Sequence, residues 1–365
     1  MRMKFSARIL SAAMAAALAA GAAQAGPALL VDLGTGKVLE HEDAFAPWYP
    51  ASLTKLMTTL VLFRAIKAGE ITLESPIRIS ERAAKEPPSK VGYKPGSVLT
   101  VDNAIKLLMV KSANDIATAV AESLTGSRAA FAERMNAEAA RLGMTGTRFV
   151  NPHGWHAQEQ TTTARDLAIM AMAMRNEFPE YAHYYAIEAL RSDNTIMENH
   201  NSLIRRFEGA DGMKTGYTCP SGQNLIATAQ RGGRSLLVVV LGEPTVEARA
   251  DKAANMLARG FATPGDSAPY LGQLRPSGQE PASAVDLRPV ICTEAHWKAV
   301  TEARGPEGKP VYTSPHLKEP VGEPAVVAVA LGGATGPKPD VPEYADVPTP
   351  TPRPDYTPAA MAQGG

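Results

Sequence analysis

Three short motifs, far apart in the chain, constrain this sequence more than any other feature. They are Ser52-Leu53-Thr54-Lys55, Ser112-Ala113-Asn114 and Lys214-Thr215-Gly216. Each motif alone is weak evidence, because a helix cap, a turn or a strand end can have the same letters. Their joint order and context are specific, with one motif opening a helix, one at a helix end and one on a strand. Together they predict a fold that brings these three places to one site.

The first motif has the spacing of a nucleophile and its base. Residues three apart on a helix share a face, so Lys55 can contact Ser52. A serine hydroxyl needs an adjacent base to act as a nucleophile. A desolvated lysine near a second cation, such as Lys214, loses its proton more readily. If Ser52 lies in the first helical turn, free backbone N–H groups there favour a developing oxyanion.

Other kinds of site have less support in the sequence. There is no G-x-S-x-G or H-E-x-x-H motif, and the seven histidines are not at metal-binding spacing. We therefore expect no metal or cofactor, and we interpret His153 and His200 as structural. Lys plus Arg and Asp plus Glu number 37 each, so nothing indicates a nucleic-acid partner.

The order of the expected elements predicts an α+β fold, an antiparallel sheet covered by helices. Strands at both ends of residues 27–261 enclose a set of helices, and that arrangement favours one sheet with helices packed on it. Periodicity and turn residues predict strands at Ala28–Asp32, Lys37–Glu40, Asn224–Ala229 and Leu236–Leu241, and helices at 52–67 and 101–111.

The N-terminal segment has the features of an export signal. Residues 1–25 begin with basic side chains, continue as an Ala-rich apolar run and end in Ala23-Gln24-Ala25, a small-x-small cleavage site. We expect the mature chain to start at Gly26 and to be exported, to the periplasm or another extracytoplasmic compartment. Residues 26–261 then form the catalytic domain.

The composition changes near residue 262, because 18 of the 29 prolines follow it. We interpret residues 262–335 as a small β-containing extension, with strands at Val285–Ile291 and Ala325–Leu331 around a helix at Glu294–Ala303. Residues 336–365 are Pro-rich and polar, which is typical of a disordered tail. This end lacks an amphipathic period and a basic face, so we expect no membrane anchoring there.

The only two cysteines, Cys219 and Cys292, can be interpreted in two ways. In an oxidising compartment two thiols commonly pair, and this pair would tie the C-terminal segment to the strand after Gly216. The alternative is two separate buried thiols, because sequence does not show whether two sulfurs meet.

The chain resembles a serine-type D-alanyl-D-alanine carboxypeptidase of the low-molecular-mass penicillin-binding protein family. The resemblance runs from about Ala28 to Phe261 and extends well beyond the three motifs. It includes Pro50 to Thr58, Lys111 to Asp115, Asn151-Pro152-His153-Gly154, Thr163 to Leu167, and Asp211 to Thr218. It implies a β-lactamase/transpeptidase-like fold and removal of the terminal D-alanine from peptidoglycan stem peptides, with β-lactams as covalent inhibitors.

The resemblance also implies a role for each matching residue. Ser52 is the acyl-ester nucleophile and Lys55 its general base. Ser112 relays a proton to the leaving amine, and Asn114 holds the acyl-side amide of the peptide. The remaining residues bind the substrate: Lys214 supplies charge, Thr215 and Arg249 hold the terminal carboxylate, Gly216 belongs to the same strand, and the N–H groups of Tyr217 and Ser52 form the oxyanion hole.

Three other functions share this motif set. A D,D-endopeptidase would cut D-alanyl cross-links with the same residues. A β-lactamase would need a carboxylate to activate the deacylating water, and only Glu159 lies near the right place in the sequence. An inactive peptidoglycan-binding scaffold would be expected to have lost catalytic residues that are all intact here. Trp155, after His153-Gly154, is bulkier than the residue expected from the resemblance.

Overall fold

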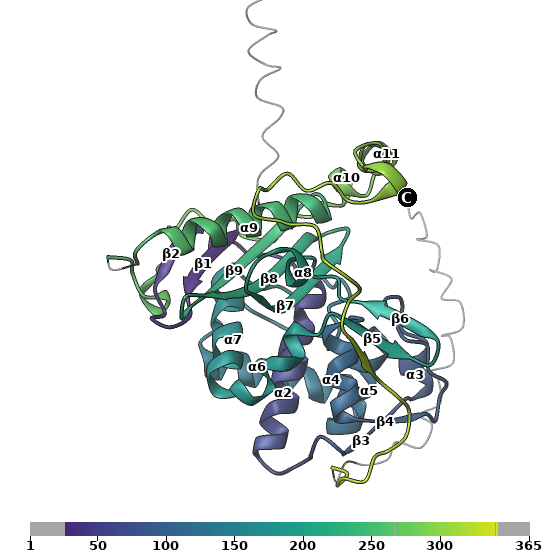
Figure 1. Ribbon diagram of the computed structural model, residues 1–365. Helices are drawn as coiled ribbons and strands as arrows, with labels where there is room; N and C mark the ends of the chain where they lie inside the picture. Colours follow the sequence, from purple (N-terminus) through teal and green to yellow (C-terminus); the bar gives the residue numbers. More distant parts are fainter. Residues whose placement is uncertain (1–25, 266, 340, 342–365) are drawn as a thin grey trace, which may run out of the picture.

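A five-stranded antiparallel sheet forms the centre of the molecule, and the predicted α+β class is confirmed (Figure 1). The computed structural model describes residues 26–265, 267–339 and 341, so the predicted signal peptide and most of the predicted tail lie outside the described residues. The strand order is β2-β1-β9-β8-β7. The strands are β1 (Ala28–Asp32), β2 (Val38–Glu42), β7 (Ala210–Thr218), β8 (Gly222–Arg231) and β9 (Arg234–Glu243).

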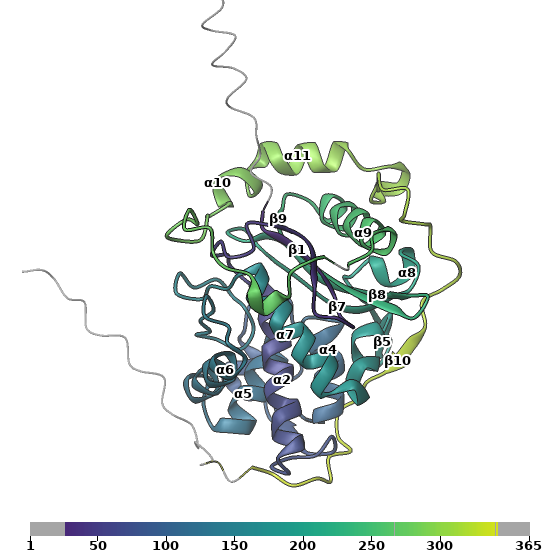
Figure 2. The same cartoon turned by 90° about the vertical axis from the view of Figure 1, so that its left-hand side faces the viewer.

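Helices cover both faces of this sheet, and the strand sequences explain why. Along β9 every residue from Leu236 to Leu241 is buried. Alternate side chains point to opposite faces of a strand. Val239 therefore packs into the larger core, while Val238 and Val240 pack against α9 (Val246–Ala262). Figure 2 shows α9 on one face and α2 and α7 on the other.

The larger helical layer is built around α2 (Thr54–Lys67), which is buried almost all round, as expected for a helix enclosed by others. Residues Ala51–Leu53 form a 3-10 turn, η1, directly before it. Helices and short strands surround α2 or lie beyond it: β3 (Pro76–Arg78), α3 (Glu81–Ala84), β4 (Val98–Thr100), α4 (Val101–Met109), α5 (Asn114–Thr125), α6 (Arg128–Leu142), α7 (Ala164–Glu177), η2 (Pro179–Ala186), β5 (Ala189–Ser192), β6 (Thr195–Glu198) and α8 (Leu203–Arg206).

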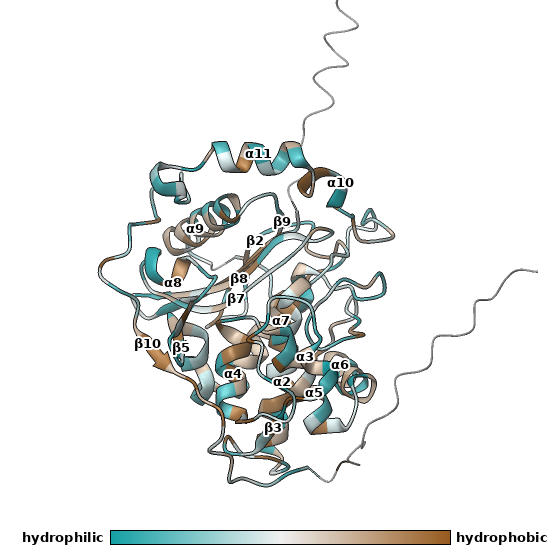
Figure 3. Ribbon diagram, turned by 90° about the vertical axis from the view of Figure 1, so that its right-hand side faces the viewer, coloured by the Kyte–Doolittle hydropathy of each residue, from teal (hydrophilic) through white to brown (hydrophobic). Residues whose placement is uncertain are grey.

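The chain after α9 crosses the catalytic body instead of leaving it. It forms η3 (Leu271–Gln273), α10 (Arg288–Ile291), α11 (Glu294–Glu302), η4 (Pro306–Gly308) and β10 (Val326–Ala328). Strand β10, brown in Figure 3, pairs in parallel with β5. The backbone N–H of Gly332 then donates to the carbonyl oxygen of Val98, so the segment continues along the helical layer.

One element of this extension was predicted wrongly. Val285–Ile291 is not a strand, because its last four residues form the helical turn α10. Pro289 lies within the first two positions of that turn, where a missing N–H costs no helical hydrogen bond. The predicted helix at 294–303 and the short strand within 325–331 are present as α11 and β10. Across the described ranges, no helix combines the length and apolar character needed to cross a bilayer.

Candidate active site

The three motifs meet at one cleft of about 500 Å³. Ser52 enters it from η1 and Ser112 from the junction of α4 and α5. Thr215 and Gly216 line it from β7, the edge strand of the sheet. Two lysines, Lys55 and Lys214, are buried at 0% and 1% exposure. The fold therefore brings together the residues of all three predicted motifs.

Lys55 is held by three oxygen atoms. Its Nζ lies 2.7 Å from Asn114 Oδ1, 2.6 Å from the backbone carbonyl of His153 and 3.0 Å from Ser52 Oγ. A neutral amine has two N–H groups and one lone pair. With the N–H groups donated to the two closer oxygens, the lone pair faces the Ser52 hydroxyl. That arrangement can accept the hydroxyl proton.

Burial keeps the pKa of Lys55 well below its usual value of 10.5, and the nearby positive charge of Lys214 lowers it further. The pKa of Lys214 is also lowered, to about 7, mainly by burial and to a smaller extent by the positive charge of Arg249. Desolvation penalises the charged form of each amine. A neutral Lys55 is thus compatible with near-neutral pH.

The second motif is held in a strained conformation. Ser112 has a φ of +60°, which costs a residue with a side chain on the order of 1–3 kcal/mol and is typical of functional sites. Asn114 is held at both ends, because its Oδ1 accepts from Lys55 and its Nδ2 donates to the carbonyl of Pro87 at 2.9 Å. In this structure Asn114 positions Lys55. Its predicted contact with the substrate amide stays a prediction.

Two glycines allow other backbone segments to approach Ser52. A β-carbon on Gly216 would lie 3.1 Å from Ser52 N and 2.9 Å from the carbonyl oxygen of Pro50. A β-carbon on Gly154 would lie 1.8 Å from the carbonyl oxygen of Ala51. Side chains at these positions would push β7 and the 151–154 loop away from the nucleophile.

One end of the cleft is cationic. Arg249 is buried, and its Nη1 and Nη2 donate to Gln223 Oε1 at 3.0 Å and to the carbonyl of His200 at 3.3 Å. Its Nε has no partner. Burial, with the charges of Lys214, Lys111 and Arg249, lowers the pKa of His200 to about 4, so this ring is neutral at pH 7. Among the described residues, no acidic side chain lines the cleft or pairs with Arg249.

Sequence reasoning missed several residues that hold the site in place. Asn224 on β8 donates to the carbonyl of Tyr49 at 2.9 Å and accepts from the N–H of Gly242, fixing the loop before Ser52. The available signal was an amide side chain directly before the apolar run Leu225 to Ala227 of the same strand. Glu86 is buried beside Thr118, Arg128 and His153.

The extension also reaches the cleft. Cys219, at the end of β7, and Cys292, at the end of α10, form a disulfide. Tyr217 lines the cleft and packs edge-on against Trp297 of α11, with ring centroids 6.4 Å apart. Tyr312, from a later part of the extension, lines the cleft beside Arg249. No position in the sequence indicated that Tyr312 would meet the site.

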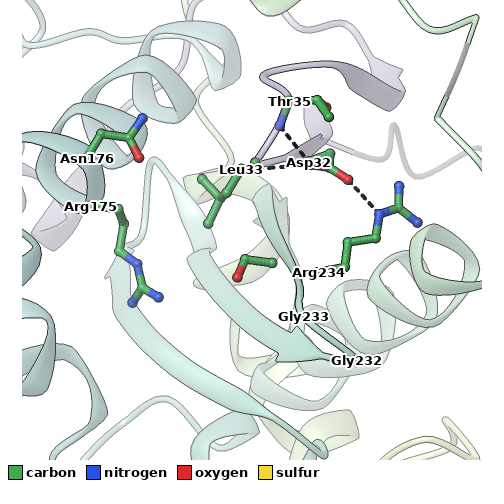
Figure 4. Close-up of a pocket in the computed structure, with 10 residues that line it drawn as sticks. Asp32, Leu33, Thr35, Arg175, Asn176, Gly232, Gly233 and Arg234 are labelled. Carbon is green, nitrogen blue, oxygen red and sulfur yellow. Dashed lines mark hydrogen bonds and ion pairs between the residues drawn. The ribbon is translucent and has the colours of Figure 1, made fainter.

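A second cavity, of about 580 Å³, lies at the opposite end of the sheet beside the β8–β9 turn (Figure 4). Its charged side chains are neutralised by partners. Arg234 pairs with Asp32 at 2.5 Å, and Arg175 pairs with Asp211. This cavity has no nucleophile with an adjacent base, so the motif-lined cleft is the candidate active site. Across the described residues, no cluster of three or more His, Cys, Asp or Glu side chains could hold a metal.

The chain belongs to the D-alanyl-D-alanine carboxypeptidase family, whose sequence model matches residues 12–245. It is 34% identical over 238 residues to the D-alanyl-D-alanine carboxypeptidase DacF of Bacillus subtilis (strain 168), covering 64% of this chain and 61% of that protein. The chain spans 60 to 62% of the length of the first curated relatives that it matches.

Solved structures agree with this family. The crystal structure of the D-alanyl-D-alanine carboxypeptidase DacD from Francisella tularensis matches with a TM-score of 0.63 at 30% identity, over 66% of this chain and 70% of that one. Penicillin-binding protein D2 from Listeria monocytogenes, in its cefotaxime-bound form, matches with a TM-score of 0.59 at 27% identity, over 65% of this chain and 97% of that one. One is named a D-alanyl-D-alanine carboxypeptidase and the other a penicillin-binding protein, as the sequence resemblance leads us to expect.

Proposed function

We propose that this protein is a serine-type D-alanyl-D-alanine carboxypeptidase that trims peptidoglycan stem peptides through an acyl-enzyme on Ser52. The observation that carries the proposal is the buried Lys55 amine, 3.0 Å from Ser52 Oγ, with its other contacts made to Asn114 and the His153 carbonyl. A base positioned in this way gives the hydroxyl the nucleophilicity that it otherwise lacks.

The reaction proceeds in two steps. Ser52 Oγ attacks the carbonyl carbon between the two D-alanines and gives its proton to Lys55. The carbonyl–nitrogen bond then breaks, and the proton returns through Ser112 to the departing amine, releasing D-alanine. Water attacks the resulting ester and regenerates the Ser52 hydroxyl. The close approach of Gly216 to Ser52 N supports an oxyanion hole made by the N–H groups of Ser52 and Tyr217.

The cationic end of the cleft fits the free carboxylate of the substrate. Arg249 has a buried Nε with no partner, and burial lowers its pKa only to about 10, so it stays charged at neutral pH. A guanidinium binds a carboxylate through paired hydrogen bonds. Thr215, on the cleft wall, adds a hydroxyl. The buried Lys214 adds a second positive charge in its protonated form, below its pKa of about 7.

We also propose that β-lactams acylate Ser52 and that the protein acts outside the cytoplasm. The Listeria relative was crystallised with cefotaxime, and the N-terminal segment has the pattern of an export signal. A β-lactamase function has less support, because Glu159, its only candidate carboxylate in the sequence, is exposed. No acidic side chain in the described part of the chain lines the cleft to replace it.

The test is D-alanine release from a synthetic peptide ending in Lys-D-Ala-D-Ala. Wild-type protein should release D-alanine and should be labelled by a fluorescent penicillin. Ser52→Ala should do neither, and Ser277→Ala, at an exposed serine outside the cleft, should match the wild type. A folded wild-type protein that takes the label but releases no D-alanine would exclude this carboxypeptidase function. Because labelling requires a reactive Ser52, that result would favour a D,D-endopeptidase on cross-links, or a penicillin-binding scaffold.

A further inference from the structure

The segment after α11 completes one wall of the cleft. Residues 310–318, here called the strap, run from η4 past the start of α9 toward α8. Tyr312 is half-buried and lines the cleft together with Arg249 and His200. Figures 1 and 2 show this part of the chain passing over the sheet side of the molecule, beside α8 and α9.

The strap is fastened at a buried carboxylate close to Arg249. Asp251 on α9 accepts three hydrogen bonds from the strap. The donors are the backbone N–H of Thr313 at 2.9 Å, the Thr313 hydroxyl at 2.7 Å and the backbone N–H of Ser314 at 2.9 Å. Hydrogen bonds to a charged group are among the stronger ones. Because Asp251 lies two residues after Arg249 on the same helix, the position of the strap is coupled to that of the arginine.

A further contact fixes the aromatic ring itself. The Tyr312 ring lies against the guanidinium of Arg206, on α8, with 4.7 Å between the guanidinium carbon and the ring centroid. The N–H of Lys318 then donates to the carbonyl of Arg206 at 2.9 Å. Tyr312 is thus held from α9 on one side and from α8 on the other, directly at the cationic end of the cleft.

We propose that Tyr312 closes the leaving-group end of the cleft and restricts the reaction to peptides that release a single D-alanine. This inference rests on the proposed function. If the substrate carboxylate binds Arg249, the side chain of the leaving residue lies near Tyr312. A methyl group fits there, whereas the leaving amine of a cross-link carries the rest of a second stem peptide. Tyr312 is then a specificity residue that disfavours endopeptidase activity.

The test compares two peptides that differ only in the size of the leaving residue. One ends in D-Ala-D-Ala, and the other ends in D-Ala-D-Lys with its Nε acylated by a short peptide, so both keep the free carboxylate. We expect the wild type to prefer the first at least 100-fold in kcat/KM. Tyr312→Ala should reduce this preference at least tenfold, and Tyr312→Val should give an intermediate value. Tyr312→Phe, which keeps the ring, should retain the preference.

Tyr270→Ala is the matched control, because Tyr270 is 50% exposed and lies outside the cleft. It should keep the wild-type preference. If Tyr312→Ala or Tyr312→Val unfolds at the same temperature as the wild type and keeps its substrate preference, this inference is wrong while the proposed function stands. A wild type that cleaves both peptides equally would have the same consequence. A wild type that neither releases D-alanine nor takes penicillin would overturn the proposed function and this inference together.

Discussion

Gly216 on β7 lies so close to Ser52 that an added β-carbon would be 3.1 Å from Ser52 N and 2.9 Å from the carbonyl oxygen of Pro50. Gly216→Ala should push β7 away from the nucleophile and misplace the proposed oxyanion donors. Losing one such donor costs about 10²–10³-fold in rate. We expect at least a 100-fold slower acylation by penicillin, measured by stopped flow.

The control for this prediction is Gly272→Ala. A β-carbon at Gly272 would meet nothing within 4 Å, so its acylation rate should equal that of the wild type. If Gly216→Ala reacted at the wild-type rate, the close approach of β7 would have no part in catalysis.

The rate of acylation should depend on pH through two lysines with opposite requirements. Lys55 must be neutral to accept the proton, so the rate should fall as the pH drops through its lowered pKa. Lys214 must be charged to attract the carboxylate, and its pKa is about 7 in the free protein, so kcat/KM should also fall above that pH. A profile of kcat/KM between pH 4 and 10 checks both limbs.

The Lys214→Arg substitution separates the contributions of Lys55 and Lys214 to the pH profile. Arginine stays charged throughout this range, so the alkaline limb should disappear and the acidic limb should remain. A wild-type profile that is flat across the range, or an alkaline limb that persists in Lys214→Arg, would show that these amines do not control the reaction.

The buried charge of Lys214 should cost stability. Its folded pKa, about 7, is lower than the usual 10.5, so the unfolded chain binds the proton more tightly than the folded protein does. The penalty is fully present below about pH 7 and disappears as the pH rises toward 10.5. Because one pKa unit corresponds to about 1.4 kcal/mol, Lys214→Met should stabilise the fold by about 2–4 kcal/mol at pH 6.

Chemical denaturation at pH 6 and pH 9.5 measures this effect, and the gain should be smaller at the higher pH. Lys298→Met is the control, since Lys298 is an exposed lysine on α11. This substitution should change the free energy of unfolding little at either pH. A Lys214→Met variant that is less stable than the wild type at pH 6 would contradict the prediction.

Much of the catalytic body could be predicted because its signals are local. The unbroken apolar run of β9 from Leu236 to Leu241 and the N-cap of α7 at Thr163 are properties of neighbouring residues, and the sequence contains them directly. The contact between Ser52 and Lys55 was predictable for the same reason, since two residues three positions apart on a helical turn lie on the same face.

The residues that were missed act across long stretches of chain. Asn224 supports Tyr49 from 175 positions away, and Tyr312 reaches a cleft whose other residues precede it by more than 60 positions. Nothing in the local pattern specifies such contacts. The wrong strand at Val285–Ile291 has a related cause, because β-branched residues suggested a strand where a proline at the start of a helical turn set the backbone.

Arg249 should matter only for substrates with a free carboxylate. We expect Arg249→Ala to reduce kcat/KM for a peptide ending in D-Ala-D-Ala at least 100-fold, because a buried charge-assisted pair is lost. With the same peptide as its C-terminal amide, the variant and the wild type should differ by less than fivefold. D-Alanine or D-alaninamide release is the measurement, and an equal loss on both peptides would mean that Arg249 is structural.

The Cys219–Cys292 disulfide should hold the extension against the cleft. It closes a segment with a sequence separation of 73, and a crosslink of this span contributes about 2–4 kcal/mol to the free energy of unfolding. Helix α11 buries no side chain, so α10 and α11 depend on the bridge more than the strap does, since Asp251 holds the strap separately.

Cys219→Ser with Cys292→Ser should therefore lower the free energy of unfolding by that amount and expose residues 275–305 to limited proteolysis, while the strap stays protected. Reduced wild-type protein should behave in the same way, which separates loss of the bridge from an effect of the serines. Penicillin acylation should persist at 25 °C, because neither sulfur contacts Ser52 or Lys55. Equal stability and equal protease resistance in the double variant would mean that packing alone holds α10 and α11 in place.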